Sequence, residues 1–121
     1  MTVVLGIGAR AAVWPPELDA AADSALSLAG LTAADVSAVA SLDRRAPVLE
    51  PFARRRGWAL VVFPPERLAV VVAPNPSARV AAATGVPSVA EAAALAAAGT
   101  GAWLLVPKTI VRGVTVAVAS R

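Results

Sequence analysis

Residues 3–10 read VVLGIGAR, and this stretch decides the fold. The apolar run over 3–7 predicts a buried strand, and the glycines let the chain leave that strand sharply. The next segment, 15–30, has the pattern of a helix, in which Pro16 suits the first turn and Gly30 ends the helix. A buried strand followed by an amphipathic helix is typical of an α/β domain.

The same alternation continues along the chain. We predict further strands over 36–42, 58–63, 102–108 and 114–120, and further helices over 47–57, 75–85 and 88–99, with one helical turn within 64–71. The last two strands are close enough to pair as an antiparallel hairpin. The sequence therefore predicts one domain over residues 1–121. It is of the α/β class, with three α/β/α layers and a mixed, mostly parallel five-stranded sheet that ends in an antiparallel hairpin.

The two helices before that hairpin carry local start signals. Asn75 can cap the first of them, with Pro76 at its first position and Gly85 at its end. Ser88 and Glu91 have the spacing of a capping box, in which each side chain bonds to the other's backbone N–H. We therefore expect separate helix starts near 75 and 88.

Composition excludes several kinds of chemistry. The chain has no Cys and no His, so the usual zinc ligands and the Cys and Ser-His nucleophile arrangements are missing. We predict no metal site and no cofactor.

The net charge of +3 favours an anionic ligand, but it is too small and too dispersed for a nucleic-acid footprint. The sequence has neither a signal-peptide pattern nor an apolar stretch long enough for a bilayer, so we expect a cytoplasmic protein that does not bind membranes. The hydrophobic fraction of 58% permits a homodimer.

The stretch GIGARA at 6–11 matches the glycine pattern of a dinucleotide-binding loop. In that motif the helix begins at the second glycine, whereas here Trp14-Pro15-Pro16 stand before the helix. We therefore favour a strand exit that lets a ligand approach the backbone, with Arg10 beside it to meet an anion. The structural alternative is a turn that needs only the conformational freedom of glycine.

Several polar residues are candidates for a site. Arg10, Arg45, Arg79 and Lys108 suit a ligand with many carboxylates, although each is also explained as surface charge. Ser77 can bind a carboxylate at a helix start or simply cap that helix. Asp43 and Glu91 are the candidates for a general base, with a turn and a capping box as the structural alternatives.

Four segments together resemble one family: GIGAR at 6–10, SLDRR at 41–45, 75–99 and LLVPKTIVRGVTVAVA at 104–119. This set is similar to the cobalamin biosynthesis family of CobE and the C-terminal domain of CbiG. The resemblance implies a role in building the corrin ring. The two-domain members open a lactone on a cobalt-precorrin and release acetaldehyde, and this chain corresponds to one of their domains.

The resemblance also assigns individual residues of this sequence to positions of the family's motifs. Gly6, Gly8 and Arg10 match the family's first motif, Asp43 its aspartate after the second strand, and the second half matches at Ser77, Gly85, Val89, Glu91 and Lys108. Ala9 stands where the family often has Cys, so a thiol role is not available there. Arg44 and Arg45 follow Asp43, and the acid expected nearby is either missing or displaced to Glu50.

These observations lead to one hypothesis with two alternatives. The protein binds or processes a precorrin-type tetrapyrrole. Alternatively, it is an accessory subunit of another cobalamin-pathway enzyme, or a hydrolase that opens a precorrin lactone, and whether it is an enzyme stays open. The expected binding residues are Gly6, Gly8, Arg10, Arg45, Ser77 and Lys108, and the candidate catalytic residues are Asp43 and Glu91.

Overall fold

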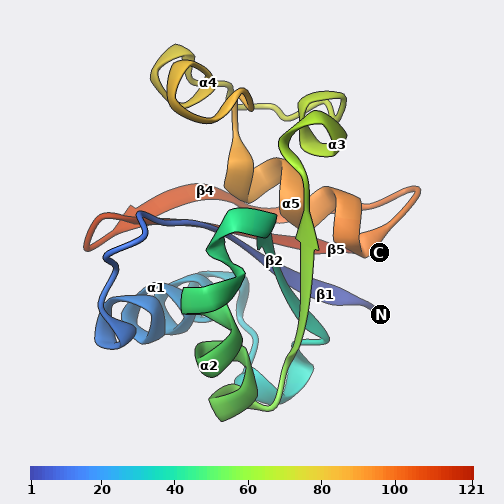
Figure 1. Cartoon of the computed structure of the whole chain (residues 1–121). Helices are drawn as coiled ribbons and strands as arrows, with labels where there is room; N and C mark the ends of the chain where they lie inside the picture. Colours follow the sequence, from blue (N-terminus) through green and yellow to red (C-terminus); the bar gives the residue numbers. More distant parts are fainter.

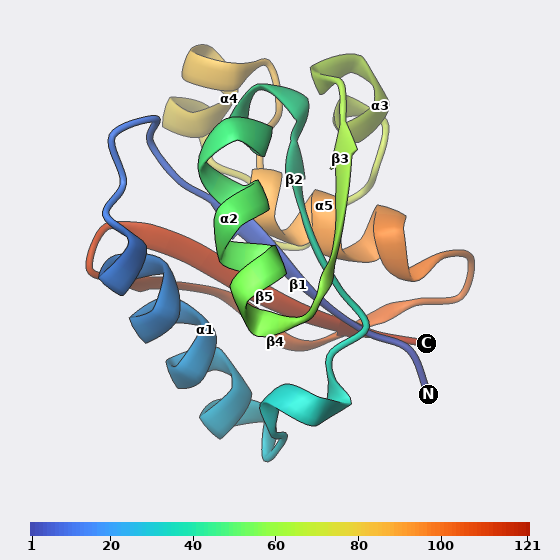
Figure 2. The same cartoon turned by 60° about the horizontal axis from the view of Figure 1, so that its bottom comes forward.

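The computed structural model describes residues 1–121, and its centre is a five-stranded sheet in the order β3-β2-β1-β5-β4 (Figures 1 and 2). The strands are β1 (Val3–Gly8), β2 (Ala38–Leu42), β3 (Ala59–Phe63), β4 (Trp103–Val111) and β5 (Val114–Ser120). β1 pairs parallel with β2, and β2 with β3, whereas β5 is antiparallel to both β1 and β4. Four strands therefore point one way and β5 the other, which confirms the mixed, mostly parallel sheet with a closing hairpin.

Helices cover both faces of this sheet. One face carries α1 (Pro15–Ala29) and α2 (Ala46–Arg56), and the other carries α3 (Pro65–Ala69), α4 (Ala78–Thr84) and α5 (Val89–Ala98). Two short 3₁₀ turns, η1 (Ala33–Asp35) and η2 (Asp43–Arg45), flank β2. Side chains of β1 alternate between the layers: Val3, Leu5 and Ile7 pack with α1 and α2, and Val4 packs with α5. The three predicted layers are confirmed.

Gly6 lies where α5 crosses β1. A Cβ added to Gly6 would overlap the backbone carbonyl oxygen of Ala90 and would stand 2.9 Å from the Cβ of Ala94. The glycine and the alanines of α5 therefore let helix and strand approach more closely than larger side chains would allow. Gly6 therefore serves the packing of α5 against β1.

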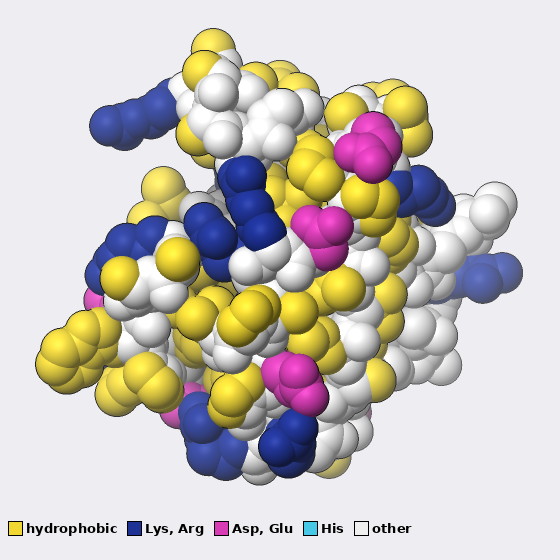
Figure 3. Space-filling model, viewed as in Figure 1, with side chains coloured by type: hydrophobic (Ala, Val, Ile, Leu, Met, Phe, Trp, Pro, Cys, Tyr) yellow, Lys and Arg dark blue, Asp and Glu magenta, His cyan; other side chains and the backbone are white.

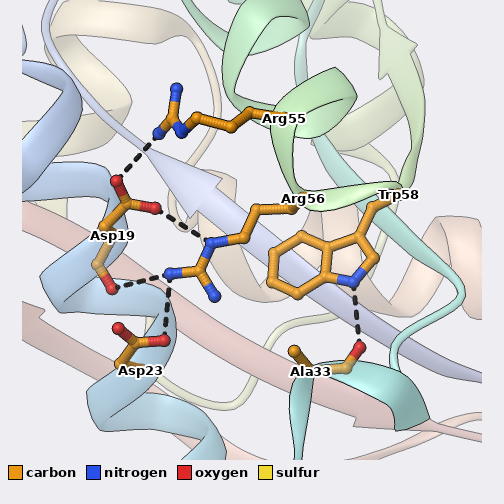
Figure 4. A network of polar contacts seen from close by, with 6 residues as sticks. All are labelled: Asp19, Asp23, Ala33, Arg55, Arg56 and Trp58. Carbon is orange, nitrogen blue, oxygen red and sulfur yellow. Dashed lines mark hydrogen bonds and ion pairs between the residues drawn. The ribbon is translucent and has the colours of Figure 1, made fainter.

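An ion-pair network joins the two helices of the other face (Figure 4). The carboxylate of Asp19 on α1 accepts hydrogen bonds from Arg55 at 2.8 Å and from Arg56 at 2.9 Å on α2, and Arg56 also donates to Asp23 at 2.9 Å. Beside it the indole N–H of Trp58 donates to the carbonyl of Ala33 at 3.0 Å. The arginines of this segment therefore orient α2 against α1.

The start of α4 differs from the prediction. The helix begins at Ala78, and Ser77 is its N-cap, with its hydroxyl accepting a hydrogen bond from the N–H of Val80 at 3.3 Å. Asn75 and Pro76 precede the helix, because both amide groups of Asn75 bind Glu91 instead. The predicted cap at Asn75 is therefore wrong.

No single helix is long and apolar enough to cross a membrane. α4 and α5 reach that length only as a pair bent by 75°, and α5 is largely buried in the protein.

Candidate functional site

The site lies at one edge of the sheet. Because β1 and β2 are parallel, their carboxyl ends meet there, together with the start of α5 and the β4–β5 hairpin. A cavity of about 450 Å³ opens between these elements and α4, which forms its outer wall. Ligands of open α/β sheets bind at such an edge, so this cavity is the candidate site.

Positive charge is concentrated in this cavity. Its lining includes Arg10, Arg44, Arg45, Arg79 and Lys108, and it includes no Asp or Glu. These five side chains are a large share of the 11 basic residues, whereas none of the 8 acidic residues lines the cavity. Figure 3 shows dark blue Lys and Arg side chains around the hollow beneath α4. A cleft with one sign of charge attracts a ligand of the opposite sign.

Two of these cations have partners within the protein. The guanidinium of Arg10 lies 3.2 Å from the carboxylate of Glu17, which also accepts the N–H of Trp14 at 2.9 Å. That backbone hydrogen bond lowers the pKa of Glu17 against the opposing effect of burial, and the charge of Arg10 lowers it further. Arg45 donates its Nε–H to the carbonyl of Ala9 at 2.6 Å. Both guanidinium groups are therefore held in place before a ligand arrives.

The other three cations are free. The side chains of Arg44, Arg79 and Lys108 form no ion pair and no hydrogen bond within the chain. They come from three different elements, namely η2, α4 and β4. A ligand that fills the cavity can therefore meet a free cation on several sides.

Backbone groups add to the positive character. α5 starts at the cavity, where Ser88, Val89 and Ala90 are part of the lining, and the side chain of Ser88 does not cap the helix. The first N–H groups of a helix have no partner within the helix and attract anions. Gly8 stands over this start, since a Cβ there would lie 4.0 Å from the nitrogen of Ala90. The glycine leaves the helix start open to a ligand.

Glu91 has a different role from the one its spacing predicts. Its buried carboxylate accepts hydrogen bonds from the backbone and side chain of Asn75 at 3.0 and 2.8 Å, the hydroxyl of Ser88 at 3.1 Å and the N–H of Lys108 at 3.0 Å. Burial raises the pKa of Glu91, but the hydrogen bonds together lower it by more than burial raises it. The pKa of Glu91 therefore lies below its usual value. Glu91 ties together three segments around the cavity, and the predicted capping box is wrong.

The structure brings most of the predicted binding residues together. Gly8, Arg10, Arg45, Ser77 and Lys108 all line the cavity. Gly6 does not, because α5 covers it. The candidate bases Asp43 and Glu91 do not line it either: Asp43 is exposed on η2, and the carboxylate of Glu91 is occupied by four donors.

Sequence reasoning missed Arg44 as a site residue. Its signal was the basic pair Arg44-Arg45 directly after a strand, at the edge where ligands bind.

Comparison with known proteins bears on this site. A family model described as "Cobalamin synthesis G C-terminus" matches residues 3–119. This chain belongs to that family. It is 36% identical to Protein CobE of Sinorhizobium sp. over 97% of this chain and 79% of that protein.

Solved structures agree with this assignment. A crystal structure of CobE, described as a protein from the cobalamin (vitamin B12) biosynthetic pathway, is similar with a TM-score of 0.85 and 33% identity over 98% of this chain and 89% of that one. The cobalamin biosynthesis protein ChiG of Agrobacterium tumefaciens has a TM-score of 0.75 and 36% identity over 98% of both chains. A cobalamin biosynthesis protein G homolog of Sulfolobus solfataricus, at 22% identity and a TM-score of 0.76 over 98% of this chain and 36% of its own, shares the fold.

Proposed function

We propose that this member of the cobalamin-synthesis family binds a precorrin-type tetrapyrrole in the basic cavity and presents it to enzymes of the pathway. The observation that carries the proposal is the set of five cations that line one cavity at the carboxyl edge of the sheet, a lining that includes no Asp or Glu. We further propose the cytoplasm as its compartment, in keeping with the sequence.

The chemistry of such a ligand suits this lining. A precorrin has a broad apolar ring whose edge carries carboxylates. Val80, Ala83 and Ile110 offer apolar surface to the ring, and the arginines can bind the carboxylates in bidentate fashion. The start of α5 adds backbone donors for a further carboxylate.

Binding is better supported than lactone hydrolysis. A hydrolase needs a general base within reach of the reacting water. The side chains that line the cavity include no carboxylate or imidazole, and the carboxylate of Glu91 is fully occupied beneath its wall. We therefore propose that any bond cleavage on the ligand is carried out by a partner enzyme.

The proposal is tested by anaerobic titration of the purified protein with precorrin intermediates, followed by the tetrapyrrole absorption bands. We expect a saturable spectral change. Arg10→Ala and Lys108→Ala should each weaken binding roughly tenfold, the usual effect of losing a hydrogen bond to a charged group. Arg54→Ala is the matched control, because Arg54 pairs with Glu50 on α2 and lies outside the cavity.

Three other outcomes would overturn parts of the proposal. The absence of a spectral change with every intermediate would refute binding. Release of acetaldehyde by this chain alone would favour the hydrolase. Co-purification with a pathway enzyme, without ligand binding in isolation, would favour the accessory subunit.

A further inference from the structure

We propose that the outer edge of β3 is a dimer interface, at which two copies of this chain pair their β3 strands antiparallel and join their sheets into one. β3 is the last strand of the sheet, beyond β2 (Figure 2). The inference goes beyond the proposed function, because no residue of β3 lines the basic cavity. It names a second copy of this chain as the partner.

The composition of β3 is that of a central strand, although β3 lies at an edge. Its five residues, ALVVF, are all apolar and include no charge, proline or glycine. A continuous apolar run is typical of a strand that is covered on both faces. β2 fits this description, since all five of its residues are buried. In β3 none of the five is buried, and Val62 is 37% exposed.

The backbone of this edge has no partner within the chain. Backbone groups of a strand point alternately to its two sides, and those on the inner side of β3 bond to β2. No hydrogen bond from a loop, a turn or a side chain reaches the backbone of residues 59–63. A row of free N–H and C=O groups is a template for a further strand.

The opposite edge of the sheet carries protection that β3 lacks. β4 contains Pro107 and Lys108, and its register with β5 shifts on both sides of Val106. Proline, lysine and bulges are the features that keep an edge strand from pairing with another chain. The register of β3 with β2 runs through all five residues without a shift. Of the two edges, β3 is therefore the one open to pairing.

β3 is also complementary to itself. In an antiparallel pair centred on Val61, that residue lies opposite its own copy. Leu60 then lies opposite Val62 of the second copy, and Ala59 opposite Phe63. Every opposed pair is apolar, and the largest side chain meets the smallest. A two-fold axis at Val61 therefore gives an interface in which one patch serves both subunits.

The charges beside β3 favour the same antiparallel arrangement. Arg54 and Arg55 end α2 just before β3, with side chains that are 76% and 47% exposed. Each donates to one carboxylate through one nitrogen and keeps donors for another. Glu66 follows β3, is exposed and forms no ion pair within the chain. Antiparallel pairing brings the end of one β3 beside the start of the other, so each Glu66 approaches the arginines of the second copy.

Such a dimer leaves both basic cavities open. The cavity lies at the carboxyl ends of β1 and β2, which run parallel to β3. Because the two β3 strands run in opposite directions, the two cavities lie at opposite margins of the joined sheet. Dimerisation and ligand binding can therefore be measured separately.

The first experiment is sedimentation velocity of the full chain from about 1 μM to about 1 mM, a range that brackets a weak dimer. We expect a dissociation constant of micromolar order, because a pair of short strands is a small interface. Val62→Lys alters two opposed pairs in each dimer, each worth up to roughly fivefold, and should weaken the dimer roughly 25-fold. Trp103→Lys is the matched control, since Trp103 is 51% exposed on the opposite edge strand and should leave the dimer unchanged. Circular dichroism checks that both variants fold.

The second experiment tests the register without introducing a charge. The chain has no Cys, so an introduced thiol reports its own position. Val61→Cys should be crosslinked into a covalent dimer by a short bismaleimide, because opposed Cβ atoms of an antiparallel pair lie about 4.5–5.5 Å apart. Trp103→Cys should remain monomeric under the same conditions.

Four results would overturn the inference. The first is a chain that stays monomeric at every concentration. The second is a dimer that Trp103→Lys weakens and Val62→Lys does not, and the third is a dimer that Val61→Cys fails to crosslink. The fourth is a monomer whose β3 instead pairs with a cobalamin-pathway enzyme and loses that enzyme in Val62→Lys. Precorrin binding in the basic cavity would stand after any of these results.

Discussion

Gly6 and Gly8 belong to the same strand and face the same helix, yet they should respond oppositely to substitution by alanine. In Gly6→Ala the new methyl group meets the backbone carbonyl of Ala90, its carbonyl carbon at 2.8 Å and the Cβ of Ala94 at 2.9 Å. Neither backbone of a core helix nor a buried methyl group can move aside easily. In Gly8→Ala the nearest atom is the Cβ of Thr115 at 3.5 Å, which is an ordinary contact.

The magnitudes follow from this geometry. Overpacking a core usually costs about 1–3 kcal/mol, and Gly6→Ala should reach about 3 kcal/mol because the main obstacle is backbone. In a chain of this length, such a loss lowers the melting temperature by roughly 12 °C. Gly8 does not have a positive φ, so Gly8→Ala should be neutral or stabilise by up to about 1 kcal/mol through the unfolded chain.

The assay is urea unfolding followed by far-ultraviolet circular dichroism, with ligand titration of the same proteins. Gly6→Ala should lose stability. Gly8→Ala should keep stability but bind a precorrin more weakly, because its methyl group stands near the start of α5. If the two variants unfold within about 0.5 kcal/mol of each other, the described approach of α5 to β1 is wrong.

Three further predictions concern the polar groups. Glu91→Gln should destabilise the protein by about 1.5–3 kcal/mol, because it weakens hydrogen bonds to a buried charge. Folding lowers the pKa of Glu91, so its carboxylate stabilises the wild-type protein fully above the pKa of the unfolded chain, about 4.3, and this stabilisation is lost as the pH falls below that value. Urea midpoints measured against pH should therefore fall less steeply in acid for Glu91→Gln than for the wild type. Asp19→Ala should cost about 1 kcal/mol by thermal unfolding, and less in high salt, whereas the same change at the more exposed Asp23 should cost less. Raising ionic strength from about 0.1 M to about 1 M should weaken precorrin binding, because the Debye length falls from about 10 Å to about 3 Å; an unchanged dissociation constant would contradict a charge-based site.

Local sequence patterns predicted the layers of the fold, because the residues that begin and end each helix and strand are neighbours in the sequence. Proline and glycine punctuate the helices, and Gly30, Gly57 and Gly85 do end α1, α2 and α4 with left-handed backbones. The start of α4 was missed because the competing partner is distant in sequence. Asn75 can cap a helix, but the buried carboxylate of Glu91 offers it a better acceptor.

The site residues, too, divide into those that local patterns could predict and those that depend on contacts distant in sequence. Arg10 and Arg45 could be assigned to one place because the parallel strands β1 and β2 bring their carboxyl ends to a common edge. Lys108 was expected at the end of its strand, but it lies within β4, which continues to Val111. Gly6 could not be separated from Gly8 in this way, since residues two apart on a strand face the same side. What separates them is where α5 begins along β1, and no local pattern contains that register.

The short helix α4 forms one wall of the cavity and contributes no fully buried residue to the core. Among the residues of α4, only Val80 packs against the core, so this wall can change with little effect on the interior. We expect substitutions along this wall to change ligand selectivity while the scaffold stays the same. An engineer can use the same freedom, exchanging residues 78–84 as a cassette to admit other polyanions into an unchanged framework.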